Sequence, residues 1–191
     1  DYSSVTRDYL LEKMKKDPRV VAITSATPTV MGFTEDKRKE AGSQFIDVGI
    51  AEETAVAVAS GIAANGGKPV YGVYSTFVQR TFDQISQDLC INNNPATIVT
   101  FWGSVYGMND VTHLGLQDIP MLSNIPNLVY LAPTTKEEYL AMLDWSIDQN
   151  EHPVAIKLPG GELVSDGKTV TKDFSKLNQY EVTQQGSKAA I

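Results

Sequence analysis

The region that most constrains the fold is residues 45–84, where two short apolar stretches are each followed by a turn and a helical pattern. Residues 45–48 and 69–74 have the composition of buried strands, and helices are predicted to begin at Glu52 and Phe77. Strand–helix–strand units form parallel sheets, whose strand-to-helix turns gather at one edge where ligands bind. The turns that lead into Glu52 and Phe77 are therefore expected at the same edge.

The remaining sequence continues this alternation. Further strands are predicted at residues 20–24, 96–102, 128–132 and 153–158, and further helices at 2–16 and 135–148. This order predicts an α/β domain over residues 1–161: a three-layer, doubly wound, mostly parallel sheet with helices on both faces. Residues 162–179 are rich in Gly, Lys, Ser and Thr and are expected to form a linker, and residues 180–191 resemble the first strand of a further domain.

Composition excludes several classes of partner. The formal net charge is −7, and the only basic cluster is Lys37 to Lys39, which argues against nucleic acid or an anionic membrane surface as a partner. The sequence contains no apolar run long enough to span a membrane. Cys90 is the single cysteine, so no internal disulfide can form, and we expect a packed thiol in a cytoplasmic protein.

Glu52 is a candidate functional residue because its helix is built almost entirely of Ala, Val and Ile. Such a helix is expected to be buried on most sides. A carboxylate in its first turn gains from the helix dipole and from free backbone donors, although separation from water disfavours its charge. The alternative is that Glu52 only caps the helix or is the solvated half of a Glu52–Glu53 pair, and helix statistics alone favour that alternative.

The helix predicted from Phe77 has two distinct faces. Spacings of four, three and four residues form an apolar core stripe of Val78, Phe82, Ile85 and Leu89. A second face carries an aromatic ring, a cation and two amides: Phe77, Arg80, Gln84 and Gln87. If it is directed toward a neighbouring carboxylate, this face could bind a flat heteroaromatic ligand. The alternative is an ordinary polar helix surface, and we assign Gln87 to such a surface.

Two stretches in this region carry a family resemblance. DVGIAEETAVAVASGIA and KPVYGVYSTFVQRTFDQ, at residues 47–63 and 68–84, resemble the pyrimidine-binding domain of thiamine-diphosphate enzymes of the transketolase superfamily. Within that superfamily the sequence of the two motifs is most similar to that of the 1-deoxy-D-xylulose-5-phosphate synthases of isoprenoid biosynthesis. The likeness extends over about residues 2–161, and the two motifs are specific together but weak apart.

The resemblance implies a role for each candidate residue. Glu52 is similar to the glutamate that shares a proton with the cofactor's aminopyrimidine, Phe77 would stack on that ring, and Tyr74 and Arg80 would line the same cavity. The cofactor carries the difficult chemistry, while the carboxylate provides general acid–base catalysis.

A long polar loop is predicted at residues 103–118. Loops of this length inside a compact domain are usually functional. The loop contains His113, one of two histidines, which would by default be an exposed bystander. The Thr112–His113 pair is part of the resemblance, which implies that His113 assists proton transfers on the substrate. His152, before a predicted strand, is assigned a structural role.

The resemblance also implies that this chain holds half of a cofactor site. In the family, a separate domain binds magnesium and diphosphate through a Gly-Asp-Gly motif followed by an asparagine, and these 191 residues contain no such motif and no predicted metal ligands. We therefore expect the chain alone to be inactive. Its implied partners are that diphosphate-binding domain, on the same protein or a companion chain, a second copy in a homodimer, and a keto acid, aldehyde or sugar phosphate substrate.

Several positions depart from the synthase pattern. Glu53-Thr54 stands where Gln-His is usual, and Asn109, beside Asp110, replaces an aspartate. The places of two arginines that grip a substrate phosphate fall at Trp102 and Gly160. Neither tryptophan nor glycine can replace an arginine–phosphate pair.

Three alternatives to synthase activity therefore remain open. They are a transketolase-like ketol transferase with a different acceptor, the β-subunit of a 2-oxo acid or acetoin dehydrogenase, and a non-catalytic docking domain.

Overall fold

The computed structural model describes residues 1–103, 111–179, 182 and 185–187. Its strands are β1 (Val20–Thr24), β2 (Phe45–Asp47), β3 (Lys68–Tyr74), β4 (Thr97–Phe101), β5 (Val129–Leu131) and β6 (Val154–Lys157). Its α-helices are α1 (Tyr2–Lys16), α2 (Glu35–Ala41), α3 (Glu52–Ala64), α4 (Phe82–Gln84), α5 (Asp118–Leu122) and α6 (Lys136–Asp148). Four further helical segments are η1 (Pro28–Met31), η2 (Gly42–Gln44), η3 (Phe77–Thr81) and η4 (Ile85–Ile91).

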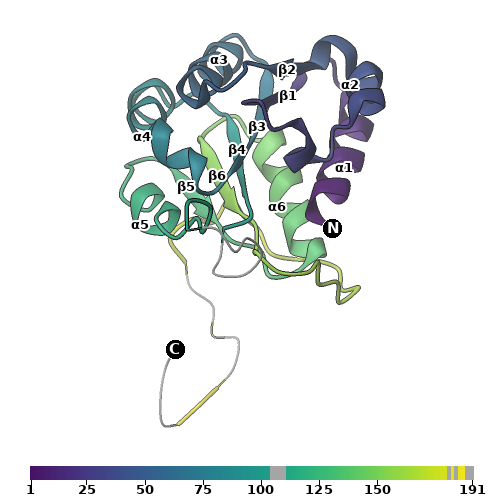
Figure 1. Cartoon of the computed structure of the whole chain (residues 1–191). Coiled ribbons are helices and arrows are strands. Elements are labelled where there is room, and N and C mark those ends of the chain that lie inside the picture. The colour runs from purple at the N-terminus through teal and green to yellow at the C-terminus, as the bar shows by residue number, and fades with distance from the viewer. Residues whose placement is uncertain (104–110, 180–181, 183–184, 188–191) are drawn as a thin grey trace.

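The six strands form one parallel sheet in the order β2-β1-β3-β4-β6-β5 (Figure 1). This confirms the predicted α/β class and the parallel sheet. The order reverses direction between β1 and β3, since the chain first moves outward to β2 and then returns past β1. In open parallel sheets, ligands bind beyond the carboxyl ends of the strands at such a reversal.

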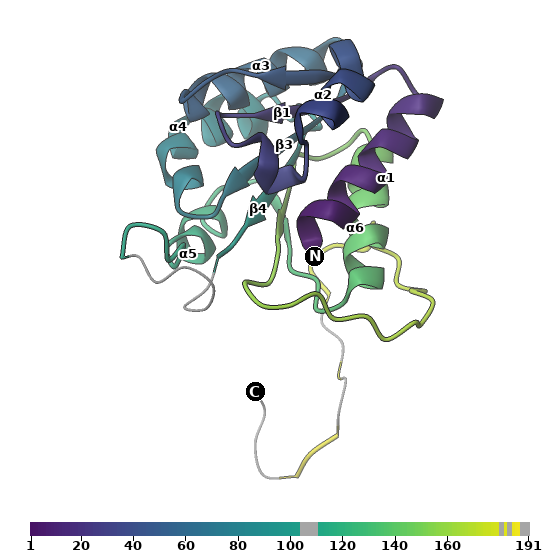
Figure 2. The same cartoon turned by 45° about the vertical axis from the view of Figure 1, so that its right-hand side comes forward.

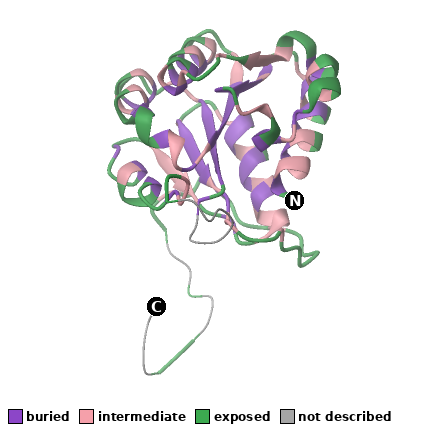
Figure 3. Ribbon diagram, in the orientation of Figure 1, coloured by how far each residue is buried: buried purple, intermediate pink, exposed green. Residues whose placement is uncertain are grey.

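Helices cover both faces of the sheet, as Figures 1 and 2 show: α1 and α6 lie side by side on one face, and α3, α4 and α5 cover the other. Alternate strand residues point to opposite faces, so two separate apolar clusters form. Leu10, Leu143 and Val70 belong to the first cluster, and Val56 and Tyr71 belong to the second. Figure 3 shows the buried strands between these layers.

The segment that begins at Phe77 is helical, but it is not the regular α-helix that the sequence predicted. It starts as the 3₁₀-helix η3, passes through the single turn α4 and continues as the π-helix η4. Val78, Ile85 and Leu89 are buried as expected, but Phe82 is 44% exposed, so its assignment to the core stripe was wrong. The 3₁₀ segment has three residues per turn, which rotates Phe82 away from the position that α-helical spacing predicts.

Helix α3 is buried on one face only. Glu52, Val56 and Ala59 lie on the buried face, whereas Ala57 and Gly61 lie on a solvent-exposed face. The small side chains on the exposed face would let another surface approach closely, as a homodimer contact requires. The homodimer expected from the sequence stays a prediction.

Residues 162–179, expected to form a linker, have neither helix nor strand and are mostly exposed, but they contact the domain at a few positions. Lys136 N donates a hydrogen bond of 2.8 Å to Val164 O, and the buried Phe174 ring lies 6.3 Å from the ring of Trp145 on α6. Most of residues 180–191, expected to begin a further domain, lie outside the described residues. Among the helices described, none combines the length and apolar character needed to cross a membrane.

Candidate active site

Glu52 is the first residue of α3, and its side chain is only 3% exposed. Oε2 lies 3.4 Å from Nη1 of Arg80, yet it accepts no hydrogen bond from any described residue. Buried polar atoms without a partner are rare, because leaving water without compensation is costly. The carboxylate therefore has an unused acceptor position inside the protein.

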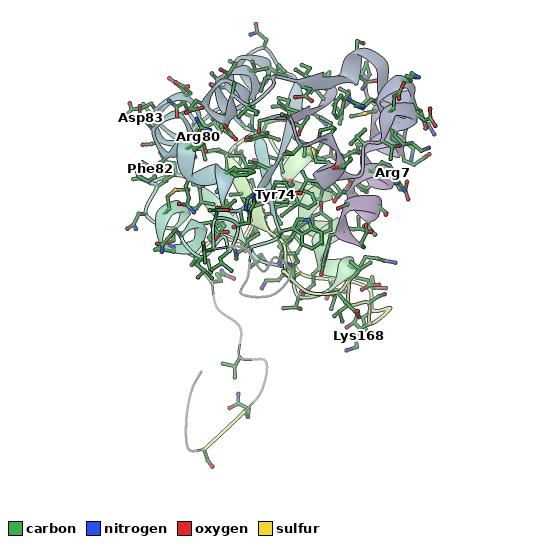
Figure 4. The ribbon with its side chains drawn as sticks, viewed as in Figure 1. Arg7, Tyr74, Arg80, Phe82, Asp83 and Lys168 are labelled. Carbon is green, nitrogen blue, oxygen red and sulfur yellow. The ribbon has the colours of Figure 1, made fainter. Side chains whose placement is uncertain are left out.

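Phe77 and Arg80 share one face of η3. Residues three apart in a 3₁₀-helix lie one above the other, so the same geometry that displaced Phe82 aligns this ring with this guanidinium. Arg80 is 53% exposed and lies near both Glu52 and Glu53, 3.8 Å from Oε1 of the latter. In Figure 4, Tyr74 lies near the centre of the view and Arg80 to its left.

His113 joins two aromatic side chains at the end of β3. Its ring centroid lies 5.2 Å from that of Phe77 and 6.4 Å from that of Tyr74, edge to face in both pairs. Tyr74 and Phe77 also contact each other edge to face at 5.6 Å. Thr112 Oγ1 and His113 Nδ1 are 2.7 Å apart. The structure thus brings together three residues predicted from the sequence, and Arg80, three residues after Phe77, lies beside Glu52.

Asp47 was not predicted to contribute, yet it connects the turns after β1 and β2. Its Oδ1 accepts hydrogen bonds from the backbone nitrogens of Ala26, at 2.8 Å, and Gly49, at 3.0 Å. Gly49 has a φ of 76°, and the Asp-X-Gly spacing is typical of a side-chain-stabilised turn. This spacing is a local signal that could have identified Asp47 as the residue that fixes the approach to α3.

Tyr71 on β3 is fully buried in the same apolar cluster as the inward face of α3. Its hydroxyl is 2.9 Å from Ser25 Oγ. Burial raises the pKa of Tyr71, and the nearby charges of Glu52 and Glu53 add to that effect. The tyrosine therefore stays neutral.

Ser75, Asp118 and Lys157 form a second polar group at this edge, which we call the Asp118 clamp. Asp118 is fully buried at the start of α5, and its Oδ2 accepts from Ser75 Oγ and Lys157 Nζ, both at 2.5 Å. The sequence did not predict α5 or this group, because its members are about 40 positions apart and none carries a motif.

Trp102 and Gly160, which stand where the synthase pattern has arginines, also come together. Both line a small cavity of about 50 Å³, together with Tyr2, Leu158 and Pro159. No lysine or arginine lines this cavity within the part of the chain that is described. Trp102 is 41% exposed and has a φ of 59°, which is strained for a bulky residue.

Asn109 and Asp110, also singled out from the sequence, lie outside the described residues. The described ranges contain no group of three or more His, Cys, Asp or Glu side chains arranged to hold a metal ion.

Gln87 is exposed, as expected. Burial raises the pKa of the Cys90 thiol to about 11, which agrees with a packed rather than a nucleophilic cysteine.

Comparison with proteins of known sequence gives long matches. The chain is 40% identical over 190 residues to 1-deoxy-D-xylulose-5-phosphate synthase of Clostridium botulinum, and 38% identical over 192 residues to that of Natranaerobius thermophilus. Each match covers 100% of this chain and 30% of the relative. The chain thus spans about a third of the length of these curated relatives.

Solved structures share the fold. A transketolase from Pichia stipitis, in complex with sedoheptulose-7-phosphate, matches with a TM-score of 0.75 and 18% identity over 88% of this chain and 27% of that one. A split gene transketolase, described as an inactive β4 tetramer, matches with a TM-score of 0.70 and 21% identity over 87% of this chain and 55% of that one. Residues 1–164 match the family described as transketolase, pyrimidine binding domain. The chain therefore belongs to the transketolase pyrimidine-binding domain family.

Proposed function

We propose that this chain is the pyrimidine-binding part of a thiamine-diphosphate-dependent transferase of the 1-deoxy-D-xylulose-5-phosphate synthase type. The observation that carries the proposal is the buried Glu52 Oε2, which has no hydrogen-bond donor among the described residues. A ring nitrogen that carries a proton is the kind of donor this oxygen lacks. Sequence identity of 40% to synthases supports the same assignment.

The surrounding residues fit an aminopyrimidine. Phe77 offers an aromatic ring for stacking, Tyr74 packs against it edge to face, and Arg80 keeps a positive charge 3.4 Å from the acid. A non-catalytic docking domain would have no need of a carboxylate shielded in this way.

The candidate site residues each have a defined task in the proposed enzyme. When bound, thiamine diphosphate supplies the carbanion chemistry of the reaction. Glu52 holds and releases a proton at Oε2, in a position from which water is excluded. Phe77 orients the bound ring, and His113, against Phe77, moves protons on the substrate side. Magnesium and the diphosphate are assigned to a domain on another segment or chain.

Binding of thiamine diphosphate to the isolated chain tests this division of the cofactor site. We expect calorimetric titration of the 191-residue chain with thiamine diphosphate and magnesium to give no saturable heat up to about 1 mM, because the chain supplies only the pyrimidine contacts. Titration of a complete 1-deoxy-D-xylulose-5-phosphate synthase provides the positive control. Micromolar affinity for the isolated chain would contradict the proposal that half of the site lies elsewhere.

The cavity at Trp102 and Gly160 favours a second candidate, a transferase of the same class whose acceptor lacks a phosphate. No cation lines this cavity within the described residues, and an anionic group gains most from paired arginines. If this second candidate is correct, the complete enzyme should use an unphosphorylated aldehyde with a kcat/KM at least as high as that of glyceraldehyde 3-phosphate. A preference of 100-fold or more for the phosphorylated acceptor would instead support synthase activity.

The partners proposed for the chain follow from the same division. We propose a homodimer in which the exposed face of α3 takes part, and association with a diphosphate-binding domain. The structural neighbour described as a split gene transketolase offers a precedent for an arrangement in separate chains. The lone, buried Cys90 is in keeping with a cytoplasmic location, which we also propose.

A further inference from the structure

The Asp118 clamp joins three segments that are distant in the sequence. Ser75 directly follows β3, Lys157 ends β6, and Asp118 begins α5. The Asp118 carboxylate is fully buried, and the Lys157 side chain is only 13% exposed. Besides the two contacts to Oδ2, Oδ1 accepts a hydrogen bond of 3.0 Å from Ile119 N. Both carboxylate oxygens therefore have donors, as a buried charge requires.

Two glycines allow this group to pack closely. A Cβ atom on Gly103, just after β4, would lie 2.3 Å from Lys157 Nζ and 2.5 Å from Ser75 Oγ. A Cβ on Gly115 would lie 2.7 Å from Ser75 Cβ, and Gly115 also has a φ of 58°. Side chains at these positions would force the group apart. Figure 2 shows α5 on the side of the sheet where β4 ends.

The clamp is continuous with the segment that carries His113. Ser75 Oγ lies 3.3 Å from Gly115 O, although its single proton is taken by the shorter bond to Asp118. The next residue, Thr76, donates a hydrogen bond of 2.8 Å from Oγ1 to Thr112 O. The segment is thus held on both sides of His113, at residue 112 by Thr76 and at Asp118 by Ser75 and Lys157.

The four residues from Tyr74 to Phe77 therefore serve two purposes. Tyr74 and Phe77 present their rings to His113, while Thr76 binds the backbone at residue 112 and Ser75 binds the side chain of Asp118. We propose that the Asp118 clamp positions His113 against Phe77, with Asp118 as a positioning residue that never contacts substrate. Any catalytic consequence rests on the function proposed above, but the position of His113 does not.

Nuclear magnetic resonance of the full 191-residue chain tests this directly, because the chain has only two histidines. With histidine and phenylalanine rings selectively ¹³C-labelled, a nuclear Overhauser contact between His113 and Phe77 is expected, since their centroids lie 5.2 Å apart. In Asp118→Asn, Lys157 loses its counter-charge in a buried position, and we expect this contact to lose at least half of its intensity. The signals of His152 should not move.

Asp148→Asn is the matched control. Asp148 pairs with Lys13 and Lys68 at the end of α6, near the start of β3 rather than its carboxyl end, so the His113 contact should be unchanged. If a folded Asp118→Asn chain keeps the full contact, the proposal is wrong. Should that variant fail to fold, Ser75→Ala decides on the same criterion, since it removes the hydroxyl and leaves the ion pair. Failure of the proposed function would appear separately: the unsubstituted chain would show the contact between His113 and Phe77, while its complete enzyme would have no transferase activity.

Discussion

Replacing Glu52 by glutamine should lower kcat/KM of the complete enzyme by at least about 100-fold, the lower end of what general acid–base catalysis contributes. Glutamine has nearly the same shape, but its amide cannot hold and release a proton at the position of Oε2. The substitution should leave the fold intact, because it replaces a buried charged group by a neutral one. Thermal unfolding followed by circular dichroism should give the same melting temperature or a higher one.

Glu53→Gln provides the control for this substitution. Glu53 is the next residue on the helix and has the same charge, but its side chain is 41% exposed and it lies farther from Arg80. We expect its variant to keep at least about half of the activity, because a surface ion pair contributes little. Full turnover by Glu52→Gln would refute the role assigned to Glu52, whereas equal losses in both variants would point to the shared contact with Arg80.

The largest effect on stability is expected at the Asp118 clamp. Lys157→Met removes the only cation within 4 Å of Asp118 among the described residues and leaves a fully buried carboxylate without a counter-charge. Removing one partner of a buried pair typically costs about 3–5 kcal/mol, a large part of the stability of an ordinary domain. Urea unfolding of the isolated chain should show a lower midpoint with a similar slope.

Two further variants separate the causes of this loss. Lys168→Met removes an exposed lysine that lies 3.3 Å from Asp166, and it should change the midpoint far less. Lys157→Met combined with Asp118→Leu removes both charges and should recover most of the stability. That double variant should nevertheless lack the contact between His113 and Phe77, because the hydrogen bond that Ser75 donates to Asp118 is gone. An unchanged midpoint in Lys157→Met would mean that the pair is not the stabilising contact described here.

Local patterns in the sequence located the elements of the sheet. β1 has the predicted bounds, and the other five strands differ from the predicted ranges by one residue at one end or at both ends. The apolar character of a strand or a helix face is set by neighbouring residues, which is why it can be read locally. The strand order could not be read in this way, because pairing depends on contacts between distant segments.

The segment after β3 shows where the local pattern failed. Spacing in the sequence placed Phe77 and Arg80 on one face, which agrees with the 3₁₀ geometry of η3, but it also placed Phe82 in the core. An α-helical period was assumed, whereas the segment changes from a 3₁₀-helix to a π-helix within fifteen residues. Such changes arise from packing against α3 and the sheet rather than from intrinsic propensity.

The sequence by itself determined the class of fold and the candidate acid, because a glutamate at the start of an apolar helix is a local pattern. Tertiary structure alone decided that Oε2 of Glu52 lacks a donor among the described residues and that Trp102 meets Gly160 at one cavity. It alone also brought Ser75, Asp118 and Lys157 together. Each of these facts depends on side chains that meet only when distant strand ends are aligned at one edge of the sheet, and no local pattern encodes that alignment.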